Sequence, residues 1–325
     1  MRLLLISDTH GHLESIHQWV RKTGADAVVH AGDFGFYDDK SLNRLSDREL
    51  ALQIRHSHLP GEVRRKAFKM SHREKVELIR EEGLLSELPM YLEGQKAFEV
   101  PVYAVWGNHE DLAVVRAFRD GTYRVPNLFV LDEDHTYTLD LFCLFGLGGN
   151  LLTDKRFFQE ALAGNGGKVW STLSQYVRLW DRVQEEAETG RIRVMVSHVS
   201  PGKEPLLAHF AALLQARYVV SGHMGSPYAC TWSPFSVQEL GEVVDQRLEA
   251  VQALIDVADK VKVRDAETRS LVKRGLDLLS QPLTAEAGRH PDWYRTHFSI
   301  NLPDAEKTLV PLTVFTRCNQ HFGRQ

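Results

Sequence analysis

The 325-residue sequence predicts an α/β fold with parallel strands, because apolar runs of strand length alternate with helical patterns. Leu3–Ile6 is short and continuously apolar, as expected of a strand buried on both faces, and a helical pattern follows over residues 12–22. Ala27–Ala31 repeats the strand pattern. The three segments predict a β-α-β unit, whose parallel strands place their carboxyl ends along one edge of a sheet.

A charged helical segment interrupts this pattern over about residues 39–95. Arginine and lysine alternate there with leucine and isoleucine, and Pro60-Gly61 breaks the segment. We interpret it as an inserted helical cap, because its apolar residues are too few to bury a domain's worth of surface.

The remaining elements continue the α/β pattern. Strands are predicted at residues 100–105, 128–131, 136–139, 142–147, 193–196 and 218–220, and helices at 169–188 and 206–215. Amphipathic helical segments over about 238–279 indicate a second helical insertion, at about 236–292, before late strands at 298–302 and 309–315. Without a repeat, low-complexity tract or linker, we expect one domain over residues 1–325 with two helical insertions.

Composition excludes few classes of function. A hydrophobic fraction of 43% and a charged fraction of 25% are typical of a soluble globular protein. The net charge of -4 gives no general attraction to nucleic acid, although a local basic groove stays compatible with it. Three widely spaced cysteines fit a reducing compartment, and no run approaches the roughly 18 apolar residues of a membrane span. The sequence predicts a cytoplasmic protein without a membrane segment.

Polar residues of metal-ligand type follow five predicted strands. They are Asp8 and His10, Asp33 after Gly32, Asn108 and His109 after Gly107, His198, and His223 after Gly222. Each alone reads as an ordinary turn or a hydrogen-bonded histidine, but chance rarely places all of them at strand ends. Carboxylate, imidazole and amide oxygen suit divalent manganese, iron or zinc, so the pattern predicts a metal site.

The order Asp-x-His, Gly-Asp, Gly-Asn-His-Glu, His, Gly-His resembles the calcineurin-like metallophosphoesterase superfamily, over about residues 1–230 and the last strands. The resemblance implies a four-layered αββα sandwich with two divalent metal ions over the sheet edges. By motif position, Asp8 and His10 would hold the first metal, Asp33 would bridge, and Asn108, His198 and His223 would complete the second. His109 would bind no metal and would face the substrate.

The chemistry that the resemblance implies requires these residue types. Two cations about 3.5–4 Å apart neutralise the phosphate oxygens and activate an attacking water. His109 is then placed to stabilise charge or to protonate the leaving alkoxide. Glu110 or Asp111 could orient this histidine, although acidic residues at a helix N-terminus are also favoured by the helix dipole.

The sequence departs from the superfamily at Gly225. The family usually reads Gly-His-x-His here, with the last histidine on the first metal, whereas this chain reads Gly222-His223-Met224-Gly225. We therefore expect an occupied second metal site and a weak or labile first one. Residues that could substitute are Asp38, Asp39, Cys230 and His297, although surface or core roles are favoured for each.

The sequence indicates a class of phosphate esters rather than a single substrate. Residues 32–36 lack the Asp-x-x-Asp-Arg-Gly extension of the Ser/Thr protein phosphatases, which disfavours a phosphoprotein substrate. The overall layout is similar to RNA lariat-debranching enzymes, although those have cysteine where this chain has Asp8. We expect hydrolysis of a phosphodiester or phosphomonoester, with a nucleotide or RNA-like substrate favoured. The alternative is a metal-binding scaffold that has lost catalysis and binds a partner through its helical insertions.

Overall fold

The computed structural model describes residues 1–55, 57–186, 190–223 and 240–280, and its first sheet is built on the N-terminal β-α-β unit. Four strands lie in the order β1-β2-β3-β4, and each neighbouring pair is parallel. The strands are β1 Leu3–Ile6, β2 Ala27–Ala31, β3 Val102–Val105 and β4 Leu128–Val130. Their carboxyl ends lie along one edge.

A second four-stranded sheet has the order β11-β10-β6-β5. Its strands are β5 Tyr137–Leu139, β6 Phe142–Leu147, β10 Ile192–Ser197 and β11 Tyr218–Ser221. β6, β10 and β11 are parallel, and β5 pairs antiparallel with β6 across the turn at residues 140–141. The predicted strands at 298–302 and 309–315 lie outside the described residues.

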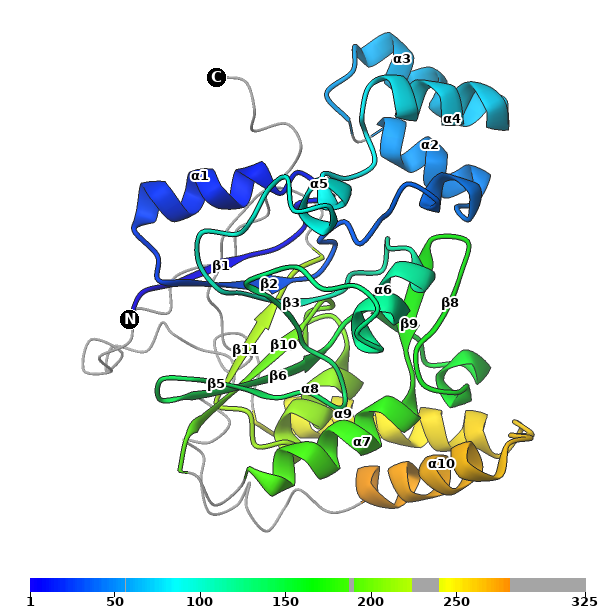
Figure 1. The fold of residues 1–325 in the computed structure, drawn as a ribbon. Helices are drawn as coiled ribbons and strands as arrows, with labels where there is room; N and C mark the ends of the chain where they lie inside the picture. The colour runs from blue at the N-terminus through cyan, green and yellow to red at the C-terminus, as the bar shows by residue number, and fades with distance from the viewer. Residues whose placement is uncertain (56, 187–189, 224–239, 281–325) are drawn as a thin grey trace.

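The two sheets pack face to face across an apolar layer. Leu5, Val29 and Val105 of the first sheet meet Leu144 and Val196 of the second in this layer. The neighbouring residues of the same strands point outward and are buried as well, which explains why the strands read as continuous apolar runs. Helix α1 (Glu14–Thr23) covers the outer face of the first sheet, and α7 (Leu173–Glu185) and α8 (Pro205–Leu213) cover that of the second (Figure 1). The predicted four-layered αββα arrangement is therefore confirmed.

The structure differs from the prediction most clearly over residues 150–172. The helix expected from residue 169 begins at Leu173, because Thr172 and Gln175 form a capping box. Before it lies a small sheet, β7-β9-β8, of strands β7 Asn150–Leu151, β8 Ala163–Asn165 and β9 Lys168–Ser171. Strands β8 and β9 form a hairpin whose two turn residues, Gly166 and Gly167, both have positive φ, as a tight primed turn requires.

The segment predicted as the first insertion is helical and has a small core of its own. Its elements are η1 Ser41–Asn43, α2 Asp47–Arg55, α3 Gly61–Lys66, η2 Ala67–Lys69, α4 His72–Glu81 and α5 Leu88–Leu92. Leu42, Leu50, Ile54 and Ile79 are buried together there, so the segment holds more apolar packing than its charged sequence indicates. The single domain with two insertions stays a prediction.

The second helical segment is described as α9 Leu240–Ala258 and α10 Ala266–Leu279. Gly275 lets α10 approach α7, since an added Cβ there would lie 2.6 Å from Leu173 Cγ.

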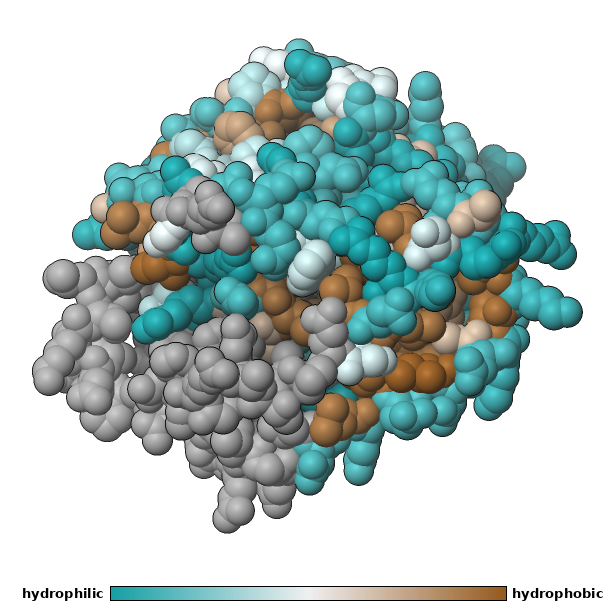
Figure 2. Space-filling model, turned by 90° about the horizontal axis from the view of Figure 1, so that it is seen from below, coloured by the Kyte–Doolittle hydropathy of each residue, from teal (hydrophilic) through white to brown (hydrophobic). Residues whose placement is uncertain are grey.

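Figure 2 views the molecule from below, where hydrophobic residues gather in patches within a largely hydrophilic face. No helix in the described part of the chain is both long and apolar enough to cross a membrane. Helix α6, Leu112–Arg119, follows the loop after β3.

Candidate metal centre

The strand ends bring the predicted metal ligands together at one edge of the two sheets. Asp8 follows β1, Asp33 follows β2, Asn108 follows β3, His198 follows β10 and His223 follows β11. Backbone hydrogen bonds join these loops: the amide of Asp8 donates to the Gly32 carbonyl at 2.8 Å, and that of His10 to the Asp33 carbonyl at 2.8 Å. Two sheets thus contribute to a single polar cluster.

The first group of possible ligands contains Asp8, His10 and Asp33, whose ligand atoms lie within 4.8 Å of one another. His10 Nε2 is 3.7 Å from Asp33 Oδ2 and 4.0 Å from Asp8 Oδ1. Both carboxylates are buried and His10 is partly exposed. Two carboxylates and an imidazole around one point are a suitable donor set for a divalent ion.

The second group contains Asp33, His198 and His223, again within 4.8 Å, and Asn108 joins it. His198 Nε2 lies 2.8 Å from Asn108 Oδ1, 3.1 Å from His223 Nδ1 and 3.6 Å from Asp33 Oδ2. Asp33 belongs to both groups, so its carboxylate is placed to bridge two ions.

The tautomer of His198 shows why this group fits a cation. Its Nδ1 lies 3.0 Å from the Ala31 carbonyl oxygen, which can only accept, so Nδ1 carries the proton. In the neutral ring, Nε2 then presents a lone pair toward Asp33 Oδ2 and Asn108 Oδ1, which are acceptors too. Burial, followed by the neighbouring His198, lowers the pKa of His223 to about 4, which keeps that ring neutral near pH 7. Imidazole nitrogens and oxygen acceptors that converge in this way suit a metal ion.

The backbone holds the ligands in an uncommon conformation. Asp8, His10, Asp33 and His223 all have positive φ, at 56°, 48°, 48° and 59°. Non-glycine residues adopt this region at a free-energy cost, and such residues concentrate at functional sites. Gly107 makes room for the Asp33 carboxylate, because a Cβ at this position would lie 1.9 Å from Asp33 Oδ1.

His109 lies beside the cluster, and hydrogen bonds hold both its backbone and its ring. Its backbone amide donates to Asp33 Oδ1 at 2.9 Å, and its ring Nδ1 lies 2.6 Å from Glu49 Oε2. Burial disfavours the imidazolium, but the Glu49 hydrogen bond and the charges of Asp33, Glu49 and Glu110 outweigh it and raise the pKa of His109 to about 9. The ring centroid is 6.5 Å from that of His10, so the ring borders the first group.

Glu49 is the residue of this site that the sequence did not indicate. It belongs to α2 in the first insertion, and its side chain is fully buried. Neither Glu110 nor Asp111, the two acidic residues expected to orient His109, bonds the His109 ring among the described contacts. The Glu110 carboxylate accepts backbone N–H groups, from Phe34 at 2.8 Å and Phe36 at 2.6 Å among others.

Asp111 and one possible substitute ligand, Asp38, form contacts away from the metal centre. Asp111 caps α6 by accepting from the Ala113 amide, and it also binds Arg44. Asp38 binds Arg44 as well and accepts from the Tyr123 hydroxyl at 2.9 Å, while Asp39 is exposed. Cys230, His297 and Gly225 lie outside the described residues.

Comparison with known proteins agrees with this geometry. The family model of the calcineurin-like phosphoesterases matches residues 1–227, and the chain belongs to this family. Its members are metal-dependent hydrolases of phosphate esters, so the chain carries a phosphoesterase fold with residues that could hold metal. No curated protein matches the chain. One similar crystal structure shares 16% identity at a TM-score of 0.37 and covers 70% of this chain and 85% of its own.

Proposed function

We propose that this protein hydrolyses a phosphodiester or phosphomonoester at a centre of two divalent metal ions. The observation that carries the proposal is Asp33. Its carboxylate belongs to both ligand groups, while its Oδ1 also accepts the backbone amide of His109. One side chain therefore links both metal positions to the residue proposed to act on the substrate.

The proposal assigns metal binding and proton donation to different residues. Asp8, His10 and Asp33 hold the first ion, and Asp33, Asn108, His198 and His223 hold the second. When bound, the two ions neutralise the phosphate and lower the pKa of the attacking water. His109 donates a proton from Nε2 to the leaving alkoxide, because Nδ1 is engaged by Glu49. Buried in α2, Glu49 fixes the ring's orientation and favours its protonated form.

The two metal positions are proposed to differ in affinity. The second has four protein ligands and the first has three, and Gly225 supplies no side chain at the position where the family usually has a further histidine. We infer that the second ion, manganese, iron or zinc, is held tightly and the first exchanges. Metal analysis of the dialysed protein tests this, and two tightly held ions per chain would contradict it.

A nucleotide or RNA-like ester is the favoured substrate. The layout similar to lariat-debranching enzymes supports it, as does the absence of the Asp-x-x-Asp-Arg-Gly extension after Asp33. The comparisons leave the substrate open within the class of phosphate esters.

The proposed reaction is tested with bis-p-nitrophenyl and mono-p-nitrophenyl phosphate in the presence of manganese. We expect hydrolysis of both esters, and with a dinucleotide, whose leaving alkoxide needs a proton, a rate that falls by about 10²- to 10⁴-fold in His109→Ala, the usual contribution of a general acid. His72→Ala is the matched control, because this histidine also pairs with a carboxylate of α2 but is largely exposed. If neither ester is hydrolysed and His109→Ala equals the wild type, the enzymatic proposal fails and the metal-binding scaffold is favoured.

A further inference from the structure

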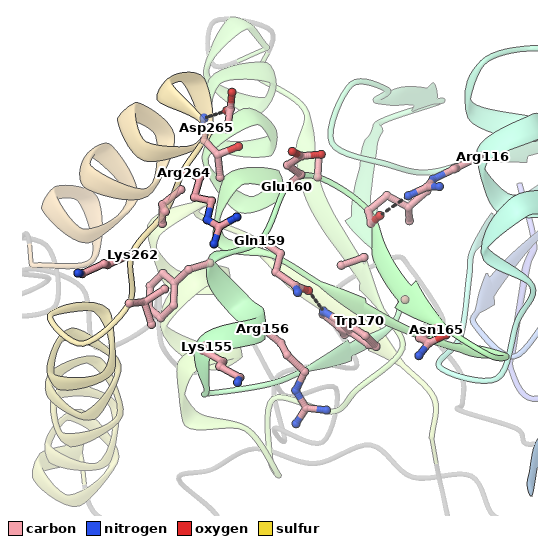
Figure 3. A pocket seen from close by; sticks show the side chains of 18 residues that line it. Arg116, Lys155, Arg156, Gln159, Glu160, Asn165, Trp170, Lys262, Arg264 and Asp265 are labelled. Atoms are coloured by element: carbon pink, nitrogen blue, oxygen red, sulfur yellow. Dashed lines mark hydrogen bonds between the residues drawn. The ribbon is translucent and has the colours of Figure 1, made fainter. Parts of the chain in front are cut away.

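A cavity apart from the metal centre is lined by basic and aromatic side chains. It has a volume of about 770 Å³, within the range of ligand-binding pockets. Its walls come from η3 (Lys155–Phe158), the β8–β9 hairpin, Arg116 of α6 and the connection between α9 and α10 (Figure 3). Segments far apart in sequence thus converge on it.

The cavity is positively charged in a chain with net negative charge. Five basic residues line it, against the two acidic residues Glu160 and Asp265. The basic residues are Arg116, Lys155, Arg156, Lys262 and Arg264. Asp265 is already used as the N-cap of α10, where it accepts from the Thr268 amide. Because the whole chain has a formal charge of -4, this local excess selects for anionic ligands.

An aromatic ring is held in the wall of this cavity. Trp170 of β9 is half-buried, and its indole N–H donates to Gln159 Oε1 at 3.1 Å (Figure 3). The Arg156 guanidinium lies 5.7 Å from the centroid of the Trp170 ring, and its Nε also donates to Asp154 at 3.0 Å. An oriented indole beside cations offers a base-stacking surface next to phosphate contacts.

The hairpin connects this cavity to the metal centre. Lys168 of β9 forms a β-bridge with His109, and the next residue, Val169, donates its amide to the Asn108 carbonyl at 3.1 Å. Lys168 and Trp170 are two residues apart on one strand, so they share a face about 7 Å apart. The hairpin therefore joins the loop that carries His109 to the wall of the cavity.

We propose that the cavity binds single-stranded nucleic acid whose scissile phosphate lies at the metal centre. Trp170 stacks on a base, and the cationic side chains contact backbone phosphates. The inference rests on the proposed function and narrows its substrate to a polymer. A polymer is favoured over a free nucleotide because the hairpin joins the cavity to the loop beside the metal centre, and a chain can occupy both regions.

Binding is tested by fluorescence anisotropy, on the full chain with manganese, using a labelled, phosphorothioate-linked single strand of about ten nucleotides to slow cleavage. We expect Trp170→Leu to weaken binding roughly 5- to 150-fold, the usual effect of losing a stacked base. The double variant Lys262→Gln/Arg264→Gln changes two exposed side chains. It should weaken binding and flatten the slope of log K against log salt by about 1.4, that is, about 0.7 for each phosphate contact.

The matched control is Arg21→Gln/Lys22→Gln on α1, which removes the same charge from another exposed surface. We expect this control to bind like the wild type. The proposal is overturned if Trp170→Leu and Lys262→Gln/Arg264→Gln bind the strand as tightly as the wild type and the control do. It is also overturned if the double variant keeps the salt slope of the control. Hydrolysis of bis-p-nitrophenyl phosphate by the wild type is measured separately, so a failure of the proposed function is distinguishable from a failure of this one.

Discussion

Glu49→Gln removes the charge that holds His109 while it keeps the size of the side chain. Glu49 Oε2 lies 2.6 Å from His109 Nδ1, and the carboxylate is fully buried. Hydrogen bonds to charged groups contribute about 1.5–3 kcal/mol, which corresponds to roughly 10- to 150-fold in rate. We expect kcat for a dinucleotide, whose leaving alkoxide needs a proton, to fall by this factor with little change in KM, because Glu49 is proposed to act on the transition state through His109.

A double-mutant cycle decides whether Glu49 acts through His109. In a His109→Ala background, Glu49→Gln should lower kcat almost no further, because the proposed effect of Glu49 passes through the His109 side chain. Asp47→Asn is the control, because Asp47 lies on the same helix and is exposed. An equal loss from Glu49→Gln with and without His109 would refute the reasoning and assign Glu49 to the fold or to metal binding.

Three further predictions concern Asp33, the neighbouring Gly107 and the buried His209. Asp33→Asn should lower the affinity for both ions, whereas His10→Ala should affect the first ion alone, as measured by calorimetric titration with manganese. Gly107→Ala should lower kcat by about 100-fold or more, because its Cβ would lie 1.9 Å from Asp33 Oδ1 and displace the bridge. His209→Gln should flatten the pH dependence of unfolding by urea between about pH 6.5 and pH 4, where burial lowers the pKa of the native His209 to about 4.

The sign of the last prediction follows from proton binding. Below its ordinary pKa of 6.5, His209 is protonated in the unfolded chain but stays neutral in the folded one until about pH 4. The unfolded state therefore binds more protons, and wild-type stability falls by about 3 kcal/mol as the pH drops through this window. Glutamine does not titrate, and its amide can still donate to the Leu279 carbonyl that accepts from His209.

Each of these three predictions has an outcome that contradicts it. Equal losses for both ions in His10→Ala would contradict the assignment of separate groups. Wild-type kcat in Gly107→Ala would mean that Asp33 does not need its observed position. An unchanged pH slope in His209→Gln would assign the acid sensitivity to other groups.

The sheets and the strand-end residues were predictable from the sequence for a shared reason. Strands buried on both faces leave continuous apolar runs such as Ala27–Ala31, and polar residues directly after such runs must lie at the sheet edge. The position of Asp8 beside Asp33 therefore follows from the strand pattern alone. The order of motifs then indicated the family, which the match over residues 1–227 confirms.

Two features depend on tertiary contacts that leave no local pattern. Glu49 reaches His109 across 60 residues of sequence, and a glutamate on a charged helix looks like any solvated residue. The β8–β9 hairpin has one buried apolar side chain, Val169, within a glycine-rich stretch, so its alternation is too short to indicate strands. Its position is set by pairing with the loop that carries His109.

At the four positions with positive φ at the sheet edge, stability and metal binding favour different residues. Each strained residue costs of the order of 1–3 kcal/mol, a substantial share of the roughly 5–15 kcal/mol that stabilises a folded domain. Glycine would relieve this cost at Asp8, His10, Asp33 or His223, but it would remove a proposed metal ligand each time. A library enriched for thermal stability alone should therefore drift toward glycine at these positions, and sequences that keep the polar residues there record selection for the site.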